Sequence, residues 1–290
     1  MNTETRATLL VGLSATLYGC LGFFGTQLIR LDFTISAMLF WRFFIAALWM
    51  LPFVFKKTKN TTAKNYNNYQ LLRIFIFGGI FYGANSALYF VASRYIGTGL
   101  AMVIFFTYPL FVVLLAWAVD KHPISKPMIL ALISIGVGLM LLKENHTVLL
   151  NKAGIFFAIA AALFYAGYIF GSKYNARNIP SRYLTILVCA GCSLVFLIIT
   201  IAKHEFIFPT SFKAWFYIIA VGIFATALPI QLLLEGLKHI QASKVAILSV
   251  LEPVVTLIVG ITALHETASL LQLVGCIIIL LSTVVIQFER

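Results

Sequence analysis

The chain has 290 residues, of which 61% are hydrophobic and only 10% are charged. Soluble domains carry roughly 25% charged residues, so the composition excludes a soluble globular protein and predicts one that spans a membrane. The net charge of +12 comes from basic residues between the apolar runs, and we expect no nucleic-acid partner.

Ten long apolar runs follow one another along the chain. A helix that crosses a bilayer core about 30 Å thick needs about 20 apolar residues at 1.5 Å per residue. Strands of a membrane barrel would instead be short and alternating. The fold class is therefore predicted to be all-α, a polytopic membrane protein with ten transmembrane helices. The predicted spans are residues 7–29, 33–55, 71–92, 98–119, 127–142, 153–172, 182–202, 214–235, 243–264 and 270–287.

The first half of the chain recurs in the second. Arg94-Tyr95-Ile96 and Lys238-His239-Ile240 lie 144 positions apart, and so do Tyr108-Pro109 and Glu252-Pro253. Because each half has five predicted spans, an odd number, the second half would be inverted in the membrane relative to the first. Many transporters form a central site between two such inverted repeats. The predicted five-helix repeats are residues 7–142 and 153–287.

The distribution of basic residues predicts the orientation in the membrane. With both termini in the cytoplasm, fourteen of the 21 Lys and Arg residues fall in cytoplasmic segments and six in outer ones, while Arg42 lies inside a span. Cytoplasmic loops of membrane proteins carry an excess of Lys and Arg. We therefore expect cytoplasmic N- and C-termini.

Two ionisable side chains, Arg42 and Glu252, each lie about nine residues into a predicted span, which is about 13 Å at 1.5 Å per residue. A lone charge near mid-membrane costs about 2.5–3.5 kcal/mol on insertion scales, so each should face the bundle interior and find a partner. One interpretation is a buried structural ion pair or helix cap. The other is a role in transport, in which Glu252 takes up a proton. The sequence leaves open whether Arg42 and Glu252 touch.

Pro109 and Pro253 occupy matching positions in the fourth and ninth spans. Each removes one intrahelical hydrogen bond, and in a membrane the freed carbonyl needs a neighbouring group or a water-filled cavity. Paired helix interruptions in two repeats point to a transport site, and a fixed kink that shapes the bundle is the alternative. Gly79 and Gly83, four residues apart, predict close contact between helix backbones.

Polar side chains on the apolar spans are mostly tyrosines and amides. Some would line a cavity of apolar walls with scattered hydrogen-bonding groups, and others would lie in the interfacial aromatic belt. Such a lining suits a small molecule with an apolar part better than a phosphate ester, which would need several inward Arg or Lys residues. The candidate cavity residues are Tyr18, Asn85, Tyr89, Tyr108, Tyr165 and Gln231.

Cys189 and Cys192 have the spacing of a redox or metal-binding pair. They lie inside an apolar span without a second pair or a nearby His, which favours small polarizable residues at a helix contact. We expect no metal site, no cofactor and no catalytic residue.

These residues together resemble the EamA repeat of the drug/metabolite transporter superfamily over nearly the whole chain. The resemblance is carried by Trp41-Arg42-Phe43, by Tyr108-Pro109-Leu110-Phe111 and above all by Leu251-Glu252-Pro253-Val254. His265-Glu266 and Leu273-Val274-Gly275 follow the last motif as the glutamate and glycine of the family do. The chain departs from the family where His122 aligns with Glu266, and it has no carboxylate in the first span.

The resemblance implies a secondary transporter that exports small metabolites, commonly amino acids or related compounds, across a bacterial inner membrane. It further implies a cavity formed by the central helices of both halves and alternating access by rocking. Facilitated diffusion and proton exchange fit the sequence equally well, and substrate, direction and oligomeric state are left open.

Two other classes of protein fit the sequence less well than a transporter. An intramembrane enzyme such as a lipid-modifying transferase would need a nucleophile, a metal cluster or a pair of carboxylates at one depth, and only one acidic residue lies near mid-membrane. A non-transporting receptor or scaffold would have a sizeable soluble domain or partner-binding loop, whereas the longest predicted loop is residues 56–70. We therefore expect a transporter, not an enzyme.

Overall fold

The computed structural model describes residues 2–55, 67–142, 151–176, 179–263 and 269–287. Every regular element in these ranges is helical. The helices are α1 (Thr3–Gly19), α2 (Leu21–Ile29), α3 (Ile35–Phe55), α4 (Asn68–Phe105), α5 (Tyr108–Asp120), α6 (Lys126–Leu142), α7 (Lys152–Ala176), α8 (Ser181–Ala202), α9 (Phe212–Gly222), the π-helical turn η1 (Ile223–Ala227), α10 (Leu228–Gly236), α11 (Ala242–Leu248), α12 (Leu251–Ala263) and α13 (Leu270–Gln287).

These elements confirm the prediction of an all-helical membrane protein. Among the described residues, eight helical segments are long and apolar enough to cross a membrane. Two shorter apolar helices, Lys126–Leu142 and Leu270–Val284, coincide with the fifth and tenth predicted spans. α4 contains two helices that meet at a kink at Gly97, and the apolar segments on either side, Asn68–Thr98 and Leu100–Asp120, correspond to the third and fourth predicted spans. Only Gly97 departs from helical geometry there, with φ of 77° and ψ of 157°, a conformation that glycine adopts without a side-chain clash.

Four of the predicted spans are interrupted near their middle. The first is broken at Cys20 between α1 and α2, and the eighth contains the π-helical turn η1. The fourth and ninth break just before α5 and α12, so that Pro109 and Pro253 each lie in the first turn of the helix that follows the break. A proline in the first turn of a helix removes no intrahelical bond, and the chain turns ahead of it.

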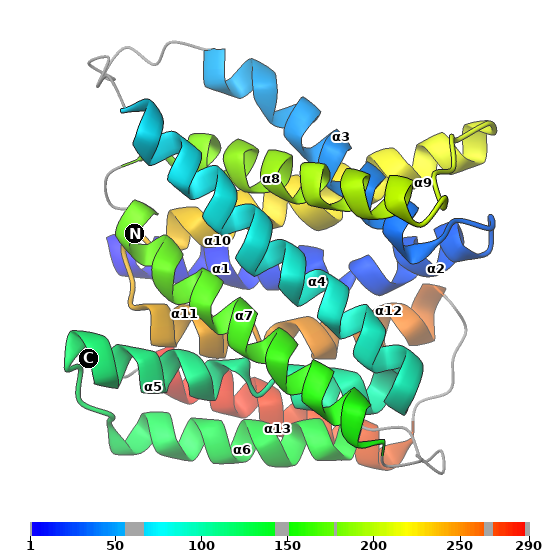
Figure 1. The fold of residues 1–290 in the computed structure, drawn as a ribbon. Coiled ribbons are helices and arrows are strands. Elements are labelled where there is room, and N and C mark those ends of the chain that lie inside the picture. The colour runs from blue at the N-terminus through cyan, green and yellow to red at the C-terminus, as the bar shows by residue number, and fades with distance from the viewer. Residues whose placement is uncertain (1, 56–66, 143–150, 177–178, 264–268, 288–290) are drawn as a thin grey trace.

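The two halves of the chain interleave and do not form separate bundles. The most extensive contacts join α4 to α7, α3 to α8 and α6 to α13, and each pair takes one helix from each half. In Figure 1, α4 and α7 cross the front of the molecule side by side, and α6 and α13 lie together at its lower edge. The core is therefore built mainly between the halves.

The contacts between the halves are reciprocal. If each span is exchanged for its counterpart five spans away, the contact of α4 with α7 becomes that of α1 with α10, and the contact of α5 with α7 becomes that of α1 with α12. The pairs α3 with α8, α5 with α11 and α6 with α13 exchange into themselves. This reciprocal pattern of contacts fits the two repeats found in the sequence.

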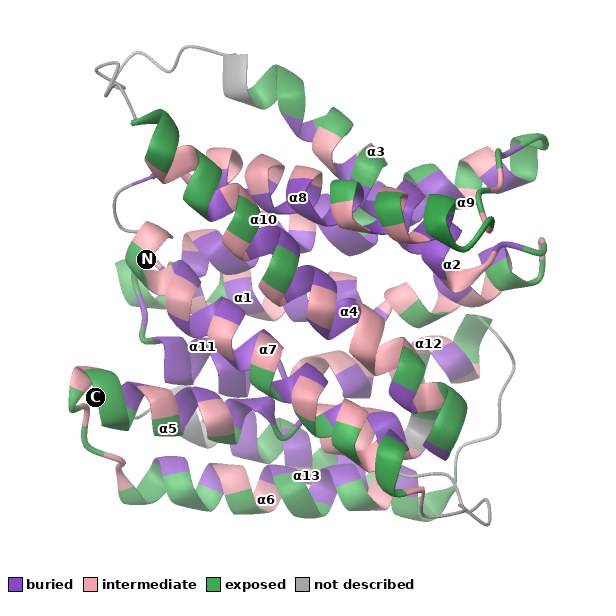
Figure 2. Cartoon of the chain, viewed as in Figure 1, coloured by how far each residue is buried: buried purple, intermediate pink, exposed green. Residues whose placement is uncertain are grey.

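Burial follows the same arrangement. Figure 2 shows buried residues where helices face one another and exposed residues on the outer faces, notably along α6 and α13. Exposed positions on those helices are apolar, for example Met140 and Leu281. A belt of exposed apolar side chains is expected where lipid is the solvent.

α1 begins and α13 ends on one side of the molecule, the left side in Figure 1. We call it the termini side. The opposite side holds α2, the start of α3 and the end of α12.

Glycines allow the backbones of α4 and α8 to touch. A Cβ atom on Gly79 would lie 3.0 Å from the backbone of Gly191, and one on Gly191 would lie 2.4 Å from the carbonyl oxygen of Phe75. These contacts meet backbone atoms, which cannot move aside as a flexible side chain can. Small residues let membrane helices approach in this way.

We expect Gly191→Ala to destabilise the protein because its methyl group has no room between α8 and α4. Overpacking a helix contact costs about 1–3 kcal/mol, so the melting temperature of the purified protein should fall by several degrees. Gly136→Ala on α6 is the matched control, since nothing lies within 4 Å of its Cβ position. Equal melting temperatures for the two variants would contradict the close contact.

Candidate functional site

A cavity of about 410 Å³ lies between the two halves. Its walls come from the end of α1, from α2, α3, α4 and α7, and from α12 with the start of α13. The deep residues Tyr18, Tyr82 and Tyr165 are buried, whereas Ile29 and Thr98 at its edge are exposed. Because Ile29 ends α2, the cavity opens on the side of the molecule opposite the termini side.

The structure brings most of the sequence-predicted residues to this cavity. Tyr108 lies outside the lining: it is buried, donates to the Ala246 carbonyl oxygen at 3.3 Å and packs edge-on against Tyr165 at 4.7 Å between ring centroids. Gln231 on α10 and Pro109 are also outside the lining. The predicted residues that line the cavity are Tyr18, Arg42, Asn85, Tyr89, Tyr165, Glu252 and Pro253.

Arg42 is held at the cavity wall by groups from three elements. Its Nε donates to the Thr226 hydroxyl on η1 at 2.7 Å, and its Nη2 lies 3.5 Å from the Tyr82 hydroxyl on α4. The guanidinium carbon lies 4.9 Å from the ring centroid of the neighbouring Phe43. With 3% of its surface exposed, Arg42 meets the requirement that a charge inside a membrane protein be hydrogen-bonded.

Glu252 lies in the first turn of α12 and lines the same cavity. Within the described parts of the chain, no ion pair of 4.0 Å or less joins it to Arg42, and no hydrogen bond engages its carboxylate. The cavity lining therefore contains a guanidinium and a carboxyl group that make no direct contact with each other.

Tyr82 and Thr226 belong to the site but were not among the predicted cavity candidates. Tyr82 donates to the Tyr18 hydroxyl at 3.0 Å. It could have been found from the sequence, because Tyr82, Asn85 and Tyr89 follow the i, i+3, i+7 spacing of one helix face. Thr226 could not, since a π-helical turn leaves no signal in hydrophobic periodicity.

The backbone interruptions surround the cavity. Where α1 ends, the Thr256 hydroxyl of α12 lies 3.2 Å from the Gly19 carbonyl oxygen and 3.0 Å from the Glu252 carbonyl oxygen, and its proton is shared between them. A Cβ atom on Gly19 would lie 2.5 Å from the Cβ atom of Val255, so the two backbones meet there. A carbonyl at a helix break in a membrane needs such a neighbour.

Charged contacts gather at the termini side. Lys244 of α11 lies 3.1 Å from Glu4 of α1, and Lys173 of α7 lies 2.7 Å from Asp120 of α5. The Tyr174 hydroxyl also donates to Asp120. Each of these pairs links the first half of the chain to the second.

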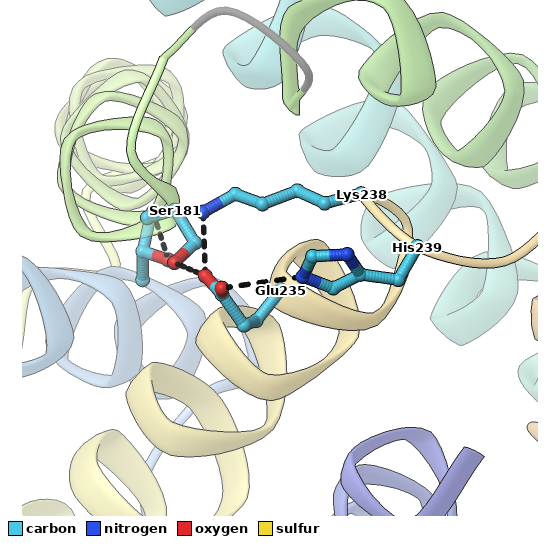
Figure 3. A network of polar contacts seen from close by, with 5 residues as sticks. Ser181, Glu235, Lys238 and His239 are labelled. Carbon is cyan, nitrogen blue, oxygen red and sulfur yellow. Dashed lines mark hydrogen bonds and ion pairs between the residues drawn. The ribbon is translucent and has the colours of Figure 1, made fainter. Parts of the chain in front are cut away.

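A third charged cluster at the termini side is centred on Glu235 at the end of α10. Figure 3 shows its carboxylate between Ser181, at the start of α8, and Lys238, each 2.6 Å from Oε2. His239 lies 4.0 Å from the other oxygen. Among the described residues, all ion pairs lie at the termini side and none bridges the cavity mouth.

Cys189 and Cys192 are buried free thiols in α8. Cys192 lies 3.6 Å from the Gly78 carbonyl oxygen of α4, which places it at a helix contact. In the described segments, no group of three or more His, Cys, Asp or Glu residues is arranged to hold a metal ion.

Several known proteins are similar to this chain. The uncharacterized transporter YcbK of Bacillus subtilis is 26% identical over 197 residues, which cover 64% of this chain and 62% of that protein. An S-adenosylmethionine uptake transporter of Rickettsia felis is 25% identical over 255 residues, which cover 87% of this chain and 82% of that protein. A crystal structure with 16% sequence identity matches with a TM-score of 0.84 over 97% of this chain and 96% of that one, and so has the same fold.

The family comparison covers both halves. The sequence matches the EamA-like transporter family twice, over residues 5–143 and 152–288. Each match contains one of the two repeats, and together they leave little of the chain outside. This protein therefore belongs to the EamA-like transporter family.

Proposed function

We propose that this protein is a secondary transporter, not an enzyme, that exports an amino acid or a similar small amphipathic compound across the bacterial inner membrane by alternating access. The observation that carries the proposal is a cavity that opens on one side of the molecule and is closed on the other by charged contacts between the halves.

The proposed topology uses all ten apolar segments. The two shorter helices, Lys126–Leu142 and Leu270–Val284, complete ten spans, so that repeats 7–142 and 153–287 are inverted relative to each other. The excess of basic residues in alternate loops supports a cytoplasmic location for the termini side. In this orientation the cavity faces outward.

The chemistry of the cavity supports an amphipathic substrate. Aromatic walls that include Tyr89 and Phe105 suit an apolar body, while the Arg42 guanidinium and the Glu252 carboxyl group offer polar partners to a zwitterion. Two relatives are named S-adenosylmethionine uptake transporters. S-adenosylmethionine carries an amino-acid group and a sulfonium cation. We include it among the candidate substrates.

The approximate two-fold relation of the repeats supports alternation. At the termini side, the ends of α5 and α7 are joined by Asp120 and Lys173. Their counterparts in the other repeat are the ends of α12 and α2, where Gly260 and Thr26 line the open cavity. Exchanging the two arrangements would close the mouth and open the termini side, which is the rocking motion proposed for inverted repeats.

We expect flux in proteoliposomes to depend on both intramembrane charges. With a panel of apolar amino acids and S-adenosylmethionine, Glu252→Gln and Arg42→Ala should each lower the initial rate about tenfold, because each removes a charged contact with substrate, worth about 1.4 kcal/mol per factor of ten. Arg30→Ala is the matched control at an exposed position. Unchanged flux in both cavity variants would remove these residues from the mechanism.

The same vesicles test coupling. Proton exchange requires that a pH gradient drive flux in the wild type and that Glu252→Gln lose this dependence, since Glu252 is the carboxylate in the cavity. Flux indifferent to the gradient in both proteins would exclude proton exchange.

Breaking the contact between Asp120 and Lys173 should shift accessibility from one side to the other. In a background without native cysteines, Thr98→Cys reports on the cavity mouth and Ser243→Cys on the small pocket beside Asp120. Adding Asp120→Asn should speed labelling of Ser243→Cys by an impermeant maleimide severalfold and slow labelling of Thr98→Cys.

The charge-swapped pair Asp120→Lys with Lys173→Asp restores the ion pair and should return both labelling rates towards those of the starting protein. Faster labelling of Ser243→Cys with no change at Thr98→Cys would mean local loosening, and alternation between two states would be rejected.

A further inference from the structure

Thr226 is a polar residue on an otherwise apolar span, and its hydroxyl makes two hydrogen bonds inside the protein. It is fully buried in η1, and its hydroxyl donates to the Val221 carbonyl oxygen at 2.8 Å. A hydroxyl has one proton to donate. Because that proton is committed to Val221, the Thr226 oxygen can only accept from its other partner, Arg42 Nε at 2.7 Å.

Tyr82 holds the other end of the guanidinium by the same logic. Its proton is donated to the Tyr18 hydroxyl at 3.0 Å, so its oxygen faces Arg42 Nη2 as an acceptor at 3.5 Å. The shorter contact, from Thr226, fixes Nε, and the longer one, from Tyr82, fixes the tilt of the planar group. Arg42 is thus oriented by two hydroxyls whose protons are committed elsewhere.

The remaining donors of Arg42 are available to a ligand. A guanidinium carries five N–H groups in a planar fork that matches a carboxylate. Nη1 has no hydrogen-bond partner among the described residues, and Arg42 lines the cavity. The carboxylate of Glu252, which would compete for these donors, makes no ion pair with Arg42 in the described structure.

We infer that Thr226 is a positioning residue, which orients Arg42 so that its free N–H groups bind the carboxylate of the substrate. The inference rests on the proposed function and deepens it, since it assigns the carboxylate of the substrate to a particular wall of the cavity. Thr226 itself does not line the cavity, so its effect passes through Arg42.

The π-helical turn η1 explains how the Thr226 hydroxyl reaches Arg42. In η1 the chain takes one extra residue into the turn, and the Thr226 hydroxyl reaches the carbonyl five positions earlier. Gly222, just before η1, lets α3 approach, because a Cβ atom there would lie 3.2 Å from the Arg42 carbonyl oxygen. π-Bulges occur frequently at functional sites, and this one brings a hydroxyl to the side chain of Arg42.

The test compares binding of two matched pairs of probes to the purified full-length protein. The pairs are L-phenylalanine with L-phenylalaninamide, and S-adenosylmethionine with its decarboxylated form. The wild type should bind the carboxylate member of a pair more tightly. Thr226→Val, which keeps the shape of the side chain, should weaken binding of that member about tenfold and leave the other member within about twofold.

Two variants separate positioning from a general loss of structure. Thr226→Ser keeps the hydroxyl and should retain wild-type affinities. Thr200→Val is the matched control, since Thr200 is equally buried and its hydroxyl has no hydrogen-bond partner in the described structure. Equal weakening of both members of a pair by Thr226→Val, or equal binding of both by the wild type, would overturn the inference.

A measurement without ligand keeps the inference separate from the proposed substrate class. Thr226→Val should lower the melting temperature more in the presence of Arg42 than in an Arg42→Met background, where no guanidinium is left without its acceptor. Additive effects would show that the two residues are not coupled and would overturn the inference. If no probe binds the wild type while the residues are coupled, the proposed substrate class fails and the link between Thr226 and Arg42 stands.

Discussion

The burial of a guanidinium at the centre of a membrane protein constrains every helix around it. A charge that leaves water must find hydrogen bonds in the protein, and Arg42 finds them on η1 and α4, which belong to different halves of the chain. Those partners are in turn held by Val221 and Tyr18. The network joins the first, second, third and eighth spans at the wall of the cavity. The position of the cavity and the packing of the halves therefore depend on each other.

Close helix contacts make this network geometrically feasible. Glycines bring α4 against α8, α1 against α12 and the end of α9 against α3, each at distances that a methyl group would not fit. The interruptions at Cys20, at η1 and before Pro253 lie beside these contacts. Within a bilayer, irregular backbone is tolerated where the protein itself or a wet cavity satisfies it, and here both conditions are met around one hollow.

The contacts between the two halves are reciprocal, but the two sides of the molecule differ: the termini side is closed and the opposite side holds the mouth of the cavity. Helix pairs related by the repeat are clamped by charges on the termini side and parted around the cavity on the other. Polar contacts at a water-accessible end are individually weak, so such a clamp can open without a large loss of stability. In the alternating-access mechanism that we propose, the contacts of α3 with α8 and of α6 with α13 keep the same partners and hold the two halves together.

Much of this protein could be predicted from the sequence, because the bilayer imposes rules that act residue by residue. Continuous apolar runs required helices, the half-length repeat indicated two related units, and Arg42 and Glu252 stood out because charges are costly in lipid. The same reasoning placed Tyr18, Asn85, Tyr89 and Tyr165 among cavity candidates. Tyr108 was not distinguishable from them, since a buried tyrosine and one that lines a cavity have the same periodicity.

Only the tertiary structure decided how the halves interleave, which charges meet and where Thr226 lies. Contacts between residues far apart in sequence, such as Arg42 with Thr226 or Asp120 with Lys173, depend on the relative placement of helices. That placement is set by close packing at particular glycines and by a π-helical turn, and neither alters the hydrophobic pattern from which the spans are predicted.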